Sequence, residues 1–442
     1  MATLAAMLKA RGHDVQGSDH AMYPPMSDYL VREAIRTFDS YRPEHITPEI
    51  DVVVVGNAIS RGNPELEEVL DRKIRFVSLP ELIRDQFLWS ARSVVIAGTH
   101  GKTTTTVMTT EALQAAGLQP TGVVGGRVGS WGGNLRYGSD RVFVVEADEY
   151  DRSFLALTPT VAVITNVEAD HLDIYADLAD IHRTFEQFAS PARTIVLCGD
   201  DAGANGLTTP SSAEIIRYGI HSRDARLLAV DVRSEGGGSI FEVEFDDEML
   251  GEVELSVPGL HNVMNALAAI ASGLTLGATL DAMRPGLAAF RGVERRFQRL
   301  GTANGVDVVD DYAHHPTEIR ATLAAARTAF PGRRIVAAFQ PHLFSRTRDF
   351  AREFGEALAA ADAVYIADIY PAREQPIPGV TADIIVASTR DAGGSVAWQG
   401  ERGSLSKELA RTVRGGDVVL TIGAGDITKT GPELLRALEG SA

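Results

Sequence analysis

The residues best suited to chemistry lie in a glycine-rich turn at 98–103, where the chain reads GTHGKT. Gly98 and Gly101 allow the backbone to turn tightly and to direct N–H groups at an anion, and Lys102 adds a positive charge. Thr103 follows the lysine directly, at the position from which a hydroxyl reaches a magnesium ion bound between two phosphates. This combination predicts a phosphate-binding loop.

The loop is a variant of the standard phosphate-binding pattern. That pattern has four residues between its first glycine and the Gly-Lys pair, whereas only Thr99 and His100 separate Gly98 from Gly101. The alternative is a glycine-capped helix start with an exposed lysine. A β-branched run before the loop and a helical pattern after it favour phosphate binding, because strand, turn and helix are in register. The threonines at 104–106 are expected to pack and cap.

A phosphate loop needs a carboxylate at the end of a neighbouring strand to help hold magnesium. Glu146 closes the apolar run VFVVE and fills that position. Three further acidic residues follow it closely, Asp148, Glu149 and Asp151. The alternative interpretation is that this acidic cluster is a solvated turn. His171 also follows an apolar strand, and it is a candidate for a second metal or the reacting centre, or else a hydrogen-bonded structural residue.

The helical pattern at 261–274 begins with polar side chains on an otherwise apolar segment. His261 and Asn262 stand at its start, and Asn265 lies near Asn262 on the helical surface. Asn262 is a candidate helix cap. A cap and a contact to a nucleotide do not exclude each other.

Three polar clusters follow in the last third of the chain, GVERRFQ, DDYAHHPTE and PHLFSRT. Arg295, Arg296 and Arg346 suit carboxylate or phosphate recognition, because a guanidinium offers paired donors. Each arginine taken alone also fits a surface ion pair.

The elements that position these residues follow an α/β rhythm. A helical segment at 2–11 precedes strand patterns at 51–58 and 74–79, and this first unit ends near Trp89. Buried strands followed by polar residues continue until 239–245, where apolar and polar residues alternate. This change of pattern indicates a mixed sheet.

From about Gly292 the α/β rhythm returns, with polar residues after each apolar strand. Ligands of open α/β sheets bind at the carboxyl ends of strands. The C-terminal polar clusters are therefore expected to line a second binding edge.

Composition limits the class of protein. A chain of 442 residues exceeds the size of one core, so two or three domains are expected. The net charge of −17 argues against non-specific attraction to nucleic acid or to an anionic membrane. The single cysteine, Cys198, cannot form an internal disulfide, and no apolar run reaches membrane-spanning length. We expect a cytoplasmic protein, a monomer or a weak homodimer, with no nucleic-acid or membrane partner.

In chain order, GTHGKTTTT, EADEYDRSFL, TNVEADHLDIY, HNVMNALAA, GVERRFQ, DDYAHHPTEI and FQPHLFSRT resemble the motifs of the Mur ligase family. The resemblance covers nearly the whole chain. It implies a ligase that uses ATP and Mg²⁺ to form an amide on a UDP-muramyl precursor of peptidoglycan, and so a role in cell wall biogenesis, cell shape and cell division.

The resemblance also implies three α/β domains. Residues 1–89 would form a Rossmann-like UDP-substrate domain that lacks its first strand, and 90–291 a central P-loop ATP-binding domain with a mixed sheet. Residues 292–442 would form a Rossmann-like amino-acid domain. Because ATP and amine would bind to different domains, closure is expected to assemble the active site.

Site residues follow from the same resemblance. The ATP-binding residues it implies are Gly98, Thr99, His100, Gly101, Lys102, Thr103, Thr104, His261, Asn262 and Asn265. The catalytic residues it implies are Lys102, which would bind the transferred phosphoryl group, His171 and Arg346. Thr103 and Glu146 would hold one magnesium ion and His171 a second. The substrate-binding residues it implies are Asp19, Asn57 and Ala58 near the UDP group, and Tyr312, His314, His342 and Arg346 on the amino-acid side.

The motifs DDYAHHPTEI, QPHLFSRT and YPARE resemble the branch of the family that joins L-alanine to UDP-N-acetylmuramate. GSDHAMYPPMSDYL and VGNAISRGNPE instead resemble the recycling branch, which attaches L-Ala-γ-D-Glu-meso-diaminopimelate to the same nucleotide sugar. We expect L-alanine, because the amine donor is decided in the C-terminal domain, and the tripeptide is the alternative.

Relatives carry a first strand and a glycine-rich turn before the helix that opens this chain. We therefore expect either a start assigned too late or a truncated chain with an incomplete nucleotide-sugar site. A truncated chain leaves open a non-catalytic sugar-nucleotide binder. A motor or switch would leave the C-terminal motifs unexplained, and the motifs near His314 and Arg346 disfavour a folate-polyglutamate ligase.

Overall fold

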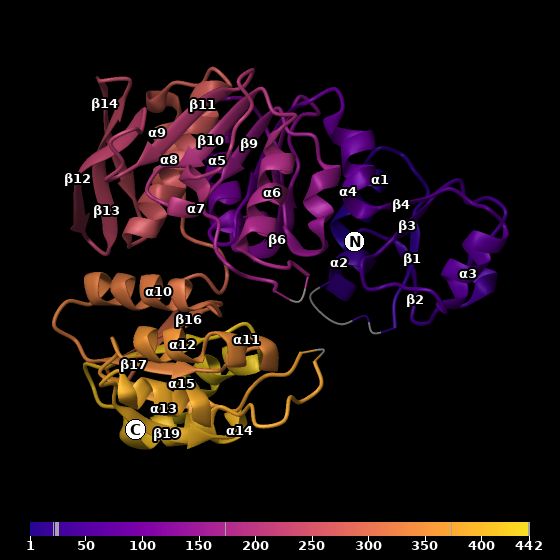
Figure 1. Cartoon of the computed structure of the whole chain (residues 1–442). Coiled ribbons are helices and arrows are strands. Elements are labelled where there is room, and N and C mark those ends of the chain that lie inside the picture. The colour runs from indigo at the N-terminus through magenta and orange to yellow at the C-terminus, as the bar shows by residue number, and fades with distance from the viewer. Residues whose placement is uncertain (21, 23–25, 173, 373, 441–442) are drawn as a thin grey trace. The chain divides into compact units, whose positions relative to one another are not determined.

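The structure is a computed structural model that describes residues 1–20, 22, 26–172, 174–372 and 374–440. Its tertiary contacts divide the chain into two compact units (Figure 1). The first unit comprises Met1–Leu228, Glu244–Glu248 and Asn265–Gly286, and the second comprises Ala229–Val243, Met249–Met264 and Leu287–Ala442. Among the described residues, no helix has the length and apolar character needed to cross a membrane.

The N-terminal part of the first unit contains two small parallel strand pairs. Its elements are α1 (Ala2–Ala10), β1 (Gln16–Ser18), α2 (Met26–Arg32), β2 (Arg36–Phe38), η1 (Pro43–His45), β3 (Val53–Val55), α3 (Pro64–Asp71), β4 (Phe76–Ser78), α4 (Leu79–Ile83) and η2 (Arg84–Leu88). β1 pairs with β2, and β3 pairs with β4. The strand predicted at 51–58 is confirmed but shorter, because the Ile59 N–H bonds the Gly56 carbonyl and closes a turn after β3.

The segment from Arg92 to Ala289 contains a large sheet. The elements from Arg92 onward are β5 (Arg92–Ala97), α5 (Lys102–Ala115), β6 (Thr121–Val128), η3 (Gly129–Trp131), β7 (Gly133–Arg136), β8 (Val142–Glu146), η4 (Tyr150–Ala156), β9 (Val161–Ile164), α6 (Leu178–Ala189), β10 (Thr194–Cys198), α7 (Ala202–Asn205), β11 (Glu214–Gly219), β12 (Leu227–Glu235), β13 (Gly238–Phe245), β14 (Glu248–Leu255), α8 (Leu260–Thr275) and α9 (Leu280–Ala289). The strand order is β14-β13-β12-β11-β10-β9-β5-β8-β6-β7. The sheet is mixed, as predicted, since β7 runs antiparallel to β6.

The centre of this sheet positions the phosphate loop. β5 lies between β8 and β9 and is parallel to both. The side chains of all three strands are almost completely buried, as expected for a strand covered on both faces. Because neighbouring parallel strands end at the same edge, the loop after β5, Glu146 at the end of β8 and the segment 165–171 after β9 share one edge.

The C-terminal part of the second unit is a six-stranded α/β sheet. Its elements are β15 (Gln298–Ala303), β16 (Val306–Asp311), α10 (Pro316–Ala329), β17 (Ile335–Phe339), α11 (Phe344–Asp349), α12 (Ala351–Leu358), β18 (Ala363–Ala367), α13 (Asp383–Asp391), β19 (Val396–Gly400), α14 (Arg402–Thr412), β20 (Val418–Ile422), η5 (Asp426–Lys429) and α15 (Thr430–Glu439). The strand order is β15-β16-β20-β17-β18-β19, and only β15 is antiparallel to its neighbour.

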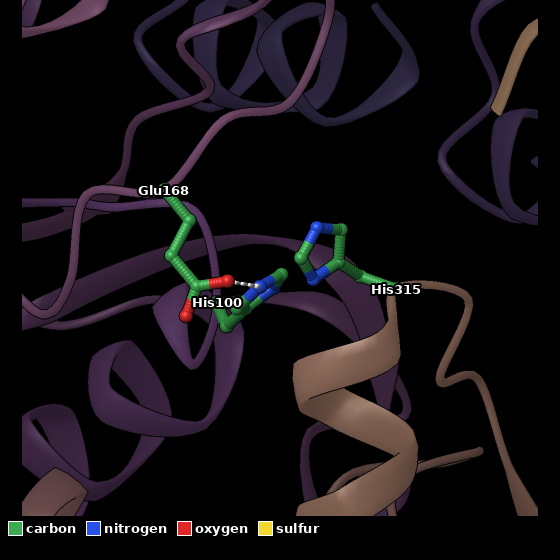
Figure 2. A group of neighbouring side chains, drawn as sticks. All are labelled: His100, Glu168 and His315. Atoms are coloured by element: carbon green, nitrogen blue, oxygen red, sulfur yellow. Dashed lines mark ion pairs between the residues drawn. The ribbon is translucent and has the colours of Figure 1, made fainter. Parts of the chain in front are cut away.

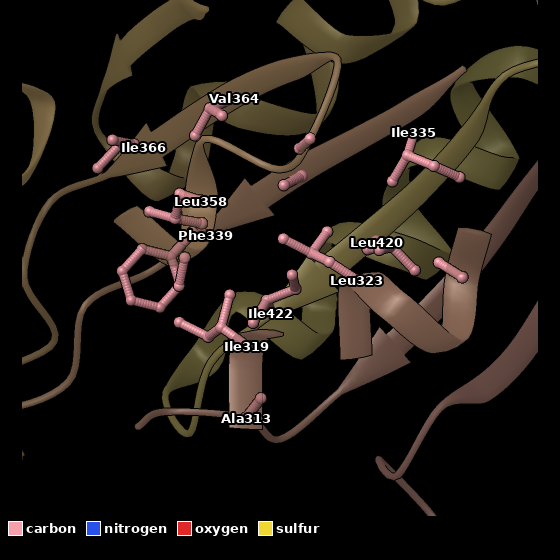
Figure 3. Close-up of a cluster of buried hydrophobic side chains, with 14 of the residues drawn as sticks. Ala313, Ile319, Leu323, Ile335, Phe339, Leu358, Val364, Ile366, Leu420 and Ile422 are labelled. Atoms are coloured by element: carbon pink, nitrogen blue, oxygen red, sulfur yellow. The ribbon is translucent and has the colours of Figure 1, made fainter. Parts of the chain in front are cut away.

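Alternation along the strands builds one core on each face of this sheet. Ile335 and Phe339 of β17 point to the face covered by α10, α12 and α13, where they meet Leu323 and Leu358 (Figure 3). Val336, one residue on, points to the opposite face, which α14 and α15 cover. A sheet packed on both faces is rigid, so the loops at its carboxyl edge start from fixed positions.

Candidate active site

The loop after β5 depends on two glycines for its conformation. Gly98 has φ +137°, and a Cβ atom there would lie 2.1 Å from Thr165 Oγ1. Gly101 has φ +80° as the residue before α5, and a Cβ there would lie 2.7 Å from Asn265 Oδ1. Both the backbone angle and the available space therefore require glycine at each position.

We expect Gly98→Ala to lower the free energy of unfolding by about 3 kcal/mol, because backbone strain and a steric clash add. Gly117, which follows α5 with φ +78° and open space around it, is the matched control. Gly117→Ala should cost only the backbone term, about 1 kcal/mol. Urea unfolding of both variants measures the difference, and equal losses would contradict the close packing described for Gly98.

The segment after β9 holds the loop in place. The Thr99 N–H donates to the Asn166 carbonyl at 3.1 Å, and the His100 N–H donates to Asn166 Oδ1 at 2.7 Å. Asn166 Nδ2 and Thr165 Oγ1 both donate to the His100 carbonyl, at 3.1 and 2.6 Å. The Glu168 N–H donates to Thr99 Oγ1 at 2.9 Å. Residues 99 and 100 are thus fixed by side chains and backbone from a neighbouring strand end.

The histidine of the loop also makes an ion-pair contact. Figure 2 shows the His100 ring beside the Glu168 carboxylate, with Nε2 3.7 Å from Oε2. His315, drawn in the same figure, belongs to the second unit, where its Nδ1 accepts the Thr317 N–H and caps α10. The predicted ATP-binding residues Thr99 and His100 therefore belong to one ordered loop structure.

The Lys102 side chain folds back into the loop and is only 14% exposed. Its Nζ donates to the carbonyl oxygens of Gly98 at 2.7 Å and Thr99 at 3.2 Å, and to Glu149 Oε2 at 2.7 Å. This placement contradicts the alternative of an exposed lysine after a helix cap. The first N–H groups of a helix point toward a bound anion. The ammonium group of a lysine folded back over the loop lies at this same helix start.

The charge of Lys102 is maintained by nearby carboxylates. Burial alone disfavours the ammonium and lowers its pKa, but Glu149, Asp148 and Glu146 outweigh this effect, so the pKa of Lys102 is raised. The lysine is therefore fully protonated at neutral pH. A positive charge held at the start of α5 is suited to bind a phosphoryl oxygen.

Thr103 and Glu146 come together as predicted for a magnesium site. Thr103 Oγ1 donates to Glu146 Oε1 at 2.8 Å, and the Gly125 N–H of β6 donates to Glu146 Oε2 at 2.6 Å. The hydroxyl and the carboxylate present oxygen ligands, which Mg²⁺ prefers. Their common position at the helix start is the arrangement expected for a metal bound next to phosphates.

A second group of potential metal ligands lies beside Lys102. Single ligand atoms of Asp148, Glu149 and His171 lie within 4.8 Å of one another. His171 Nε2 is 4.0 Å from Glu149 Oε1, a buried atom that has no hydrogen-bond partner among the described residues. An unsatisfied buried carboxylate oxygen facing a histidine fits a bound cation. The alternative that the acidic cluster is a solvated turn is wrong for Glu149, which is 3% exposed, whereas Asp148 and Asp151 are exposed.

His171 is held in an uncommon backbone conformation. Its φ is +52°, its N–H bonds Asp170 Oδ1 at 2.8 Å, and its ring lies edge-on to Tyr150. Its Nε2 is also 3.8 Å from Asp170 Oδ2. Several contacts thus fix this histidine beside the Glu149 carboxylate, as expected for strain stored at a functional site.

The hydroxyls of the threonine run bond to carbonyl oxygens of their own helix. Thr106 Oγ1 donates to the Lys102 carbonyl at 2.8 Å. Thr109 and Thr110 likewise donate to the carbonyl four residues earlier, each at 2.7 Å. Thr104 is buried like its neighbours. The packing predicted for 104–106 is confirmed, because all three side chains are buried. The predicted capping is wrong, since the N-cap residue of α5 is Gly101 and no side chain caps it.

Asn265 of α8 faces the loop. Thr105 Oγ1 donates to Asn265 Oδ1 at 3.0 Å, and the same oxygen approaches Gly101. His261 and Asn262 belong to the second unit. The Asn262 side chain donates from Nδ2 to the Pro258 carbonyl at 2.7 Å, so it lies inside the first turn of α8 and is not the cap that was predicted. Burial and then Arg296 lower the pKa of His261 to about 4, which leaves its ring neutral at pH 7.

The residues predicted for the UDP group lie at the ends of two short strands. Asp19 follows β1, and its Oδ1 accepts the His20 N–H and the Tyr41 hydroxyl. Asn57 and Ala58 are exposed in the turn after β3. The side chains of Asn57 and Ala58 are therefore accessible to a ligand.

The predicted amino-acid residues gather at the carboxyl edge of the second sheet. The His314 ring lies 5.3 Å from the Tyr312 ring and 6.1 Å from the His342 ring. His314 Nδ1 lies 3.0 Å from the Tyr312 carbonyl and 3.2 Å from Glu318 Oε2. Arg346, on α11 after β17, is 6% exposed. The sequence prediction that these loops share one edge is confirmed for the three aromatic rings.

Arg295 has a structural role that differs from the predicted anion recognition. Its guanidinium donates from Nη2 to the carbonyls of Gly423 and Gly425, at 2.7 and 3.3 Å, and from Nε to Asp310 at 3.3 Å. It also lies over the Tyr312 ring, 4.8 Å from the centroid. The donors of Arg295 are thus directed at the protein itself.

Asp311 provides a prediction about pH. Its two oxygens accept the N–H groups of Ala313 and Phe297, each at 2.8 Å. Burial raises the pKa of Asp311 to about 6, and the main opposing influence is Arg296. The folded state therefore binds a proton more tightly than the unfolded state between pH 4 and 6, and stability falls as pH rises through this window.

Asp311→Asn removes this titration. From pH 4 to pH 7 the wild-type chain should lose about 3 kcal/mol of unfolding free energy relative to the variant. Denaturant unfolding of both proteins across this range measures the difference. Parallel curves would show that Asp311 does not titrate with a raised pKa.

Some residues of this arrangement escaped the sequence prediction. Glu149 was named only as part of an acidic cluster, and Asn166 was not singled out, although both hold the loop. The position of Asn166 directly after the apolar run VAVIT was the available signal. The hydrogen bonds from Arg295 to the 423–425 loop could not be predicted from the sequence, because the two segments lie far apart along the chain.

Comparison with known proteins gives the same family along the whole chain. A profile described as Mur ligase family, catalytic domain, matches residues 1–87. A profile described as Mur ligase middle domain matches 96–273, and one described as Mur ligase, glutamate ligase domain, matches 295–425. The three matched ranges leave only short segments between them and at the C-terminus.

Individual relatives point to one branch. The UDP-N-acetylmuramate--L-alanine ligase of Salinibacter ruber is 42% identical, over 99% of this chain and 93% of its own length. The solved UDP-N-acetylmuramate-alanine ligase of Thermotoga maritima gives a TM-score of 0.82 at 28% identity, and the alignment covers 100% of this chain and 97% of that one. A murein peptide ligase of Psychrobacter arcticus gives 0.69 at 28% identity, over 99% and 96%. The chain is thus more similar in structure to the alanine ligase than to the murein peptide ligase.

Proposed function

The chain belongs to the Mur ligase family, and from this premise we propose that it joins L-alanine to the lactyl carboxylate of UDP-N-acetylmuramate at the expense of ATP. Its fold is the three-domain α/β fold of these ligases. The reaction belongs to peptidoglycan synthesis, and so to cell wall biogenesis, cell shape and cell division. The division at residues 89 and 291 is part of the proposal, and the ranges that the three family profiles match support it.

The observation that carries the proposal is the ammonium group of Lys102, which bonds the Gly98 and Thr99 carbonyls and Glu149. A preorganised charge in a water-poor site stabilises charge that develops on a transferring phosphoryl group. We assign ATP to the loop residues Gly98, Thr99, His100, Gly101, Lys102, Thr103 and Thr104, and to the α8 residues His261, Asn262 and Asn265, these three at the adenine end.

The donor set fits magnesium. We assign one ion to Thr103 and Glu146, whose oxygens already lie together, and a second to His171 with the adjacent carboxylate of Glu149. The unsatisfied Glu149 Oε1 supports the second assignment. Bound there, Mg²⁺ would neutralise phosphate charge and orient the phosphoryl oxygens.

The remaining substrates are assigned by position. Asp19, Asn57 and Ala58 would contact the UDP group at the strand ends of the N-terminal part. Tyr312, His314, His342 and Arg346 would bind L-alanine, with the Arg346 guanidinium as partner of the α-carboxylate. The His314 ring, which lies near Tyr312 and His342, would receive the proton that the ammonium group must lose.

The chemistry requires activation, because a carboxylate does not react with an amine at neutral pH. A lactyl carboxylate oxygen attacks the γ-phosphorus of ATP, the bond to the β–γ bridging oxygen breaks, and ADP leaves. Lys102 stabilises the charge on the transferred phosphoryl group. The deprotonated amine of L-alanine then attacks the acyl carbon, and inorganic phosphate leaves with the oxygen that came from the carboxylate.

We place the protein in the cytoplasm, as a monomer or weak homodimer without nucleic-acid or membrane partners. One cysteine and a net charge of −17 support this assignment.

Phosphate release with ATP, Mg²⁺ and UDP-N-acetylmuramate tests the amine donor, with L-alanine or the tripeptide L-Ala-γ-D-Glu-meso-diaminopimelate added in parallel. We expect release that depends on L-alanine. Release that depends only on the tripeptide would establish the recycling reaction, and the absence of release with either amine would refute the ligase assignment.

A further inference from the structure

The short helix α11, which carries Arg346, is not capped by the side chain of its own N-cap residue. It spans only Phe344–Asp349, and its N-cap residue, Leu343, provides no side-chain cap and has φ +68°. The first N–H groups of a helix have no partner inside it. A helix of this length also gains little stability from its own hydrogen bonds. Its orientation must therefore be fixed by contacts from elsewhere.

Glu374, from the loop after β18, supplies the missing cap. Glu374 Oε2 accepts the Ser345 N–H at 3.0 Å, and Glu374 Oε1 accepts the Ser345 hydroxyl in a short contact. Both carboxylate oxygens are thus used by one residue in the first turn of α11. A charged acceptor at a helix N-terminus is the stronger kind of cap, because it also interacts favourably with the helix dipole.

Hydrogen bonds and a ring stack also join the loops that carry Ser345 and Glu374. The Tyr370 N–H donates to the Pro341 carbonyl at 2.8 Å, and the Leu343 N–H returns to the Tyr370 carbonyl at 3.0 Å. The His342 and Tyr370 rings stack, with centroids 5.8 Å apart and planes 13° apart. The Glu374 N–H bonds the Pro371 carbonyl at 2.9 Å. Glu374 is therefore held at a defined place relative to Ser345.

Arg346 follows Ser345 directly and is buried. A long side chain on a short helix moves with the helix end, so a small rotation at Ser345 displaces the guanidinium. Misplacement of a binding group by about 1 Å can cost about 100-fold in rate. The Glu374–Ser345 contact is thus placed to control the position of Arg346.

We propose that Glu374 is a positioning residue for the amino-acid substrate: it caps α11 from a separate loop and so fixes Arg346 for the α-carboxylate. This inference rests on the proposed function and extends it to a residue without any contact to the reacting atoms. Loss of the cap should weaken the binding of L-alanine selectively, since the groups assigned to ATP belong to other elements.

The test compares Glu374→Ala and Glu374→Gln in the full-length chain. Glu374→Ala should raise the KM for L-alanine by about tenfold to 100-fold and leave the KM values for ATP and UDP-N-acetylmuramate unchanged. Glu374→Gln keeps an oxygen for the Ser345 N–H and an amide for its hydroxyl, so it should restore most of the affinity. Hydrogen exchange of a peptide spanning 343–349 should be faster in Glu374→Ala.

Glu433→Ala is the matched control. Glu433 accepts from Arg402 Nη1 with both oxygens, at 3.0 and 2.9 Å, in the same unit, so its loss removes a comparable contact elsewhere. It should change thermal stability without changing the KM for L-alanine. A Glu374→Ala variant that matches this control in all three KM values, or that raises all three together, would overturn the inference.

The hydrogen-exchange readout separates this inference from the proposed function. If the wild-type chain shows no phosphate release dependent on L-alanine, the proposed function fails. Unchanged exchange of the 343–349 peptide in Glu374→Ala would then also overturn the capping role, while faster exchange confined to this peptide would support it.

Discussion

Replacing Lys102 with methionine should lower phosphate release that depends on L-alanine by about 1000-fold, while the protein remains folded. Methionine keeps the length and apolar stem of the side chain but removes the ammonium group that bonds Gly98, Thr99 and Glu149. One preorganised charge aimed at a transferring group contributes about 100- to 1000-fold to rate. A steady-state assay at saturating ATP measures the loss.

Two controls give this result its meaning. Lys407→Met removes a lysine of α14, far along the chain from the loop, and should leave the rate unchanged. Circular dichroism and thermal unfolding of Lys102→Met test whether the fold survives, because the change also leaves Glu149 buried without its partner. A folded Lys102→Met protein with near wild-type turnover would contradict the assigned role.

Glu149→Gln should lower the rate by about 100-fold and raise the Mg²⁺ concentration needed for half-maximal rate by at least tenfold. The change removes one charge that holds Lys102 protonated and one oxygen that faces His171. Loss of a group that orients a metal site costs about 10- to 100-fold in metal affinity. A Mg²⁺ titration of the rate at fixed ATP separates the two effects.

Asp151→Asn is the matched control, because Asp151 is an exposed acid of the same segment. Its Mg²⁺ titration should overlay that of the wild type. If Glu149→Gln and Asp151→Asn gave the same modest shift, the effect would reflect general electrostatics rather than a bound ion. The double variant Lys102→Met with Glu149→Gln should lose much less than the product of the single losses, since the two residues act as a pair.

Local patterns in the sequence were sufficient for the loop and its framework. The turn at 98–103 with flanking strand and helix, the contact between Thr103 and Glu146, and the mixed sheet all follow from spacing and from the rule that ligands bind at strand ends. These features depend on residues close in sequence or on adjacent parallel strands. Such features are the ones that periodicity and turn chemistry specify.

The sequence did not show which charged residues would pair with each other. Asp148, Glu149 and Asp151 look equivalent along the chain, and only folding buries Glu149 against Lys102 while it leaves Asp151 exposed. Arg295 likewise looks like an anion-binding residue until the 423–425 loop uses its donors. Long-range pairing of polar groups depends on tertiary geometry, which single-sequence patterns do not contain.

In the proposed reaction, the loop at Lys102 supports transfer of a phosphoryl group to a carboxylate that L-alanine then attacks. The most direct test labels both oxygens of the lactyl carboxylate of UDP-N-acetylmuramate with oxygen-18 and follows them by mass spectrometry. The account predicts one labelled oxygen in the released phosphate and one in the amide of the UDP-N-acetylmuramoyl-L-alanine product. Unlabelled phosphate, released while L-alanine is consumed, would contradict it.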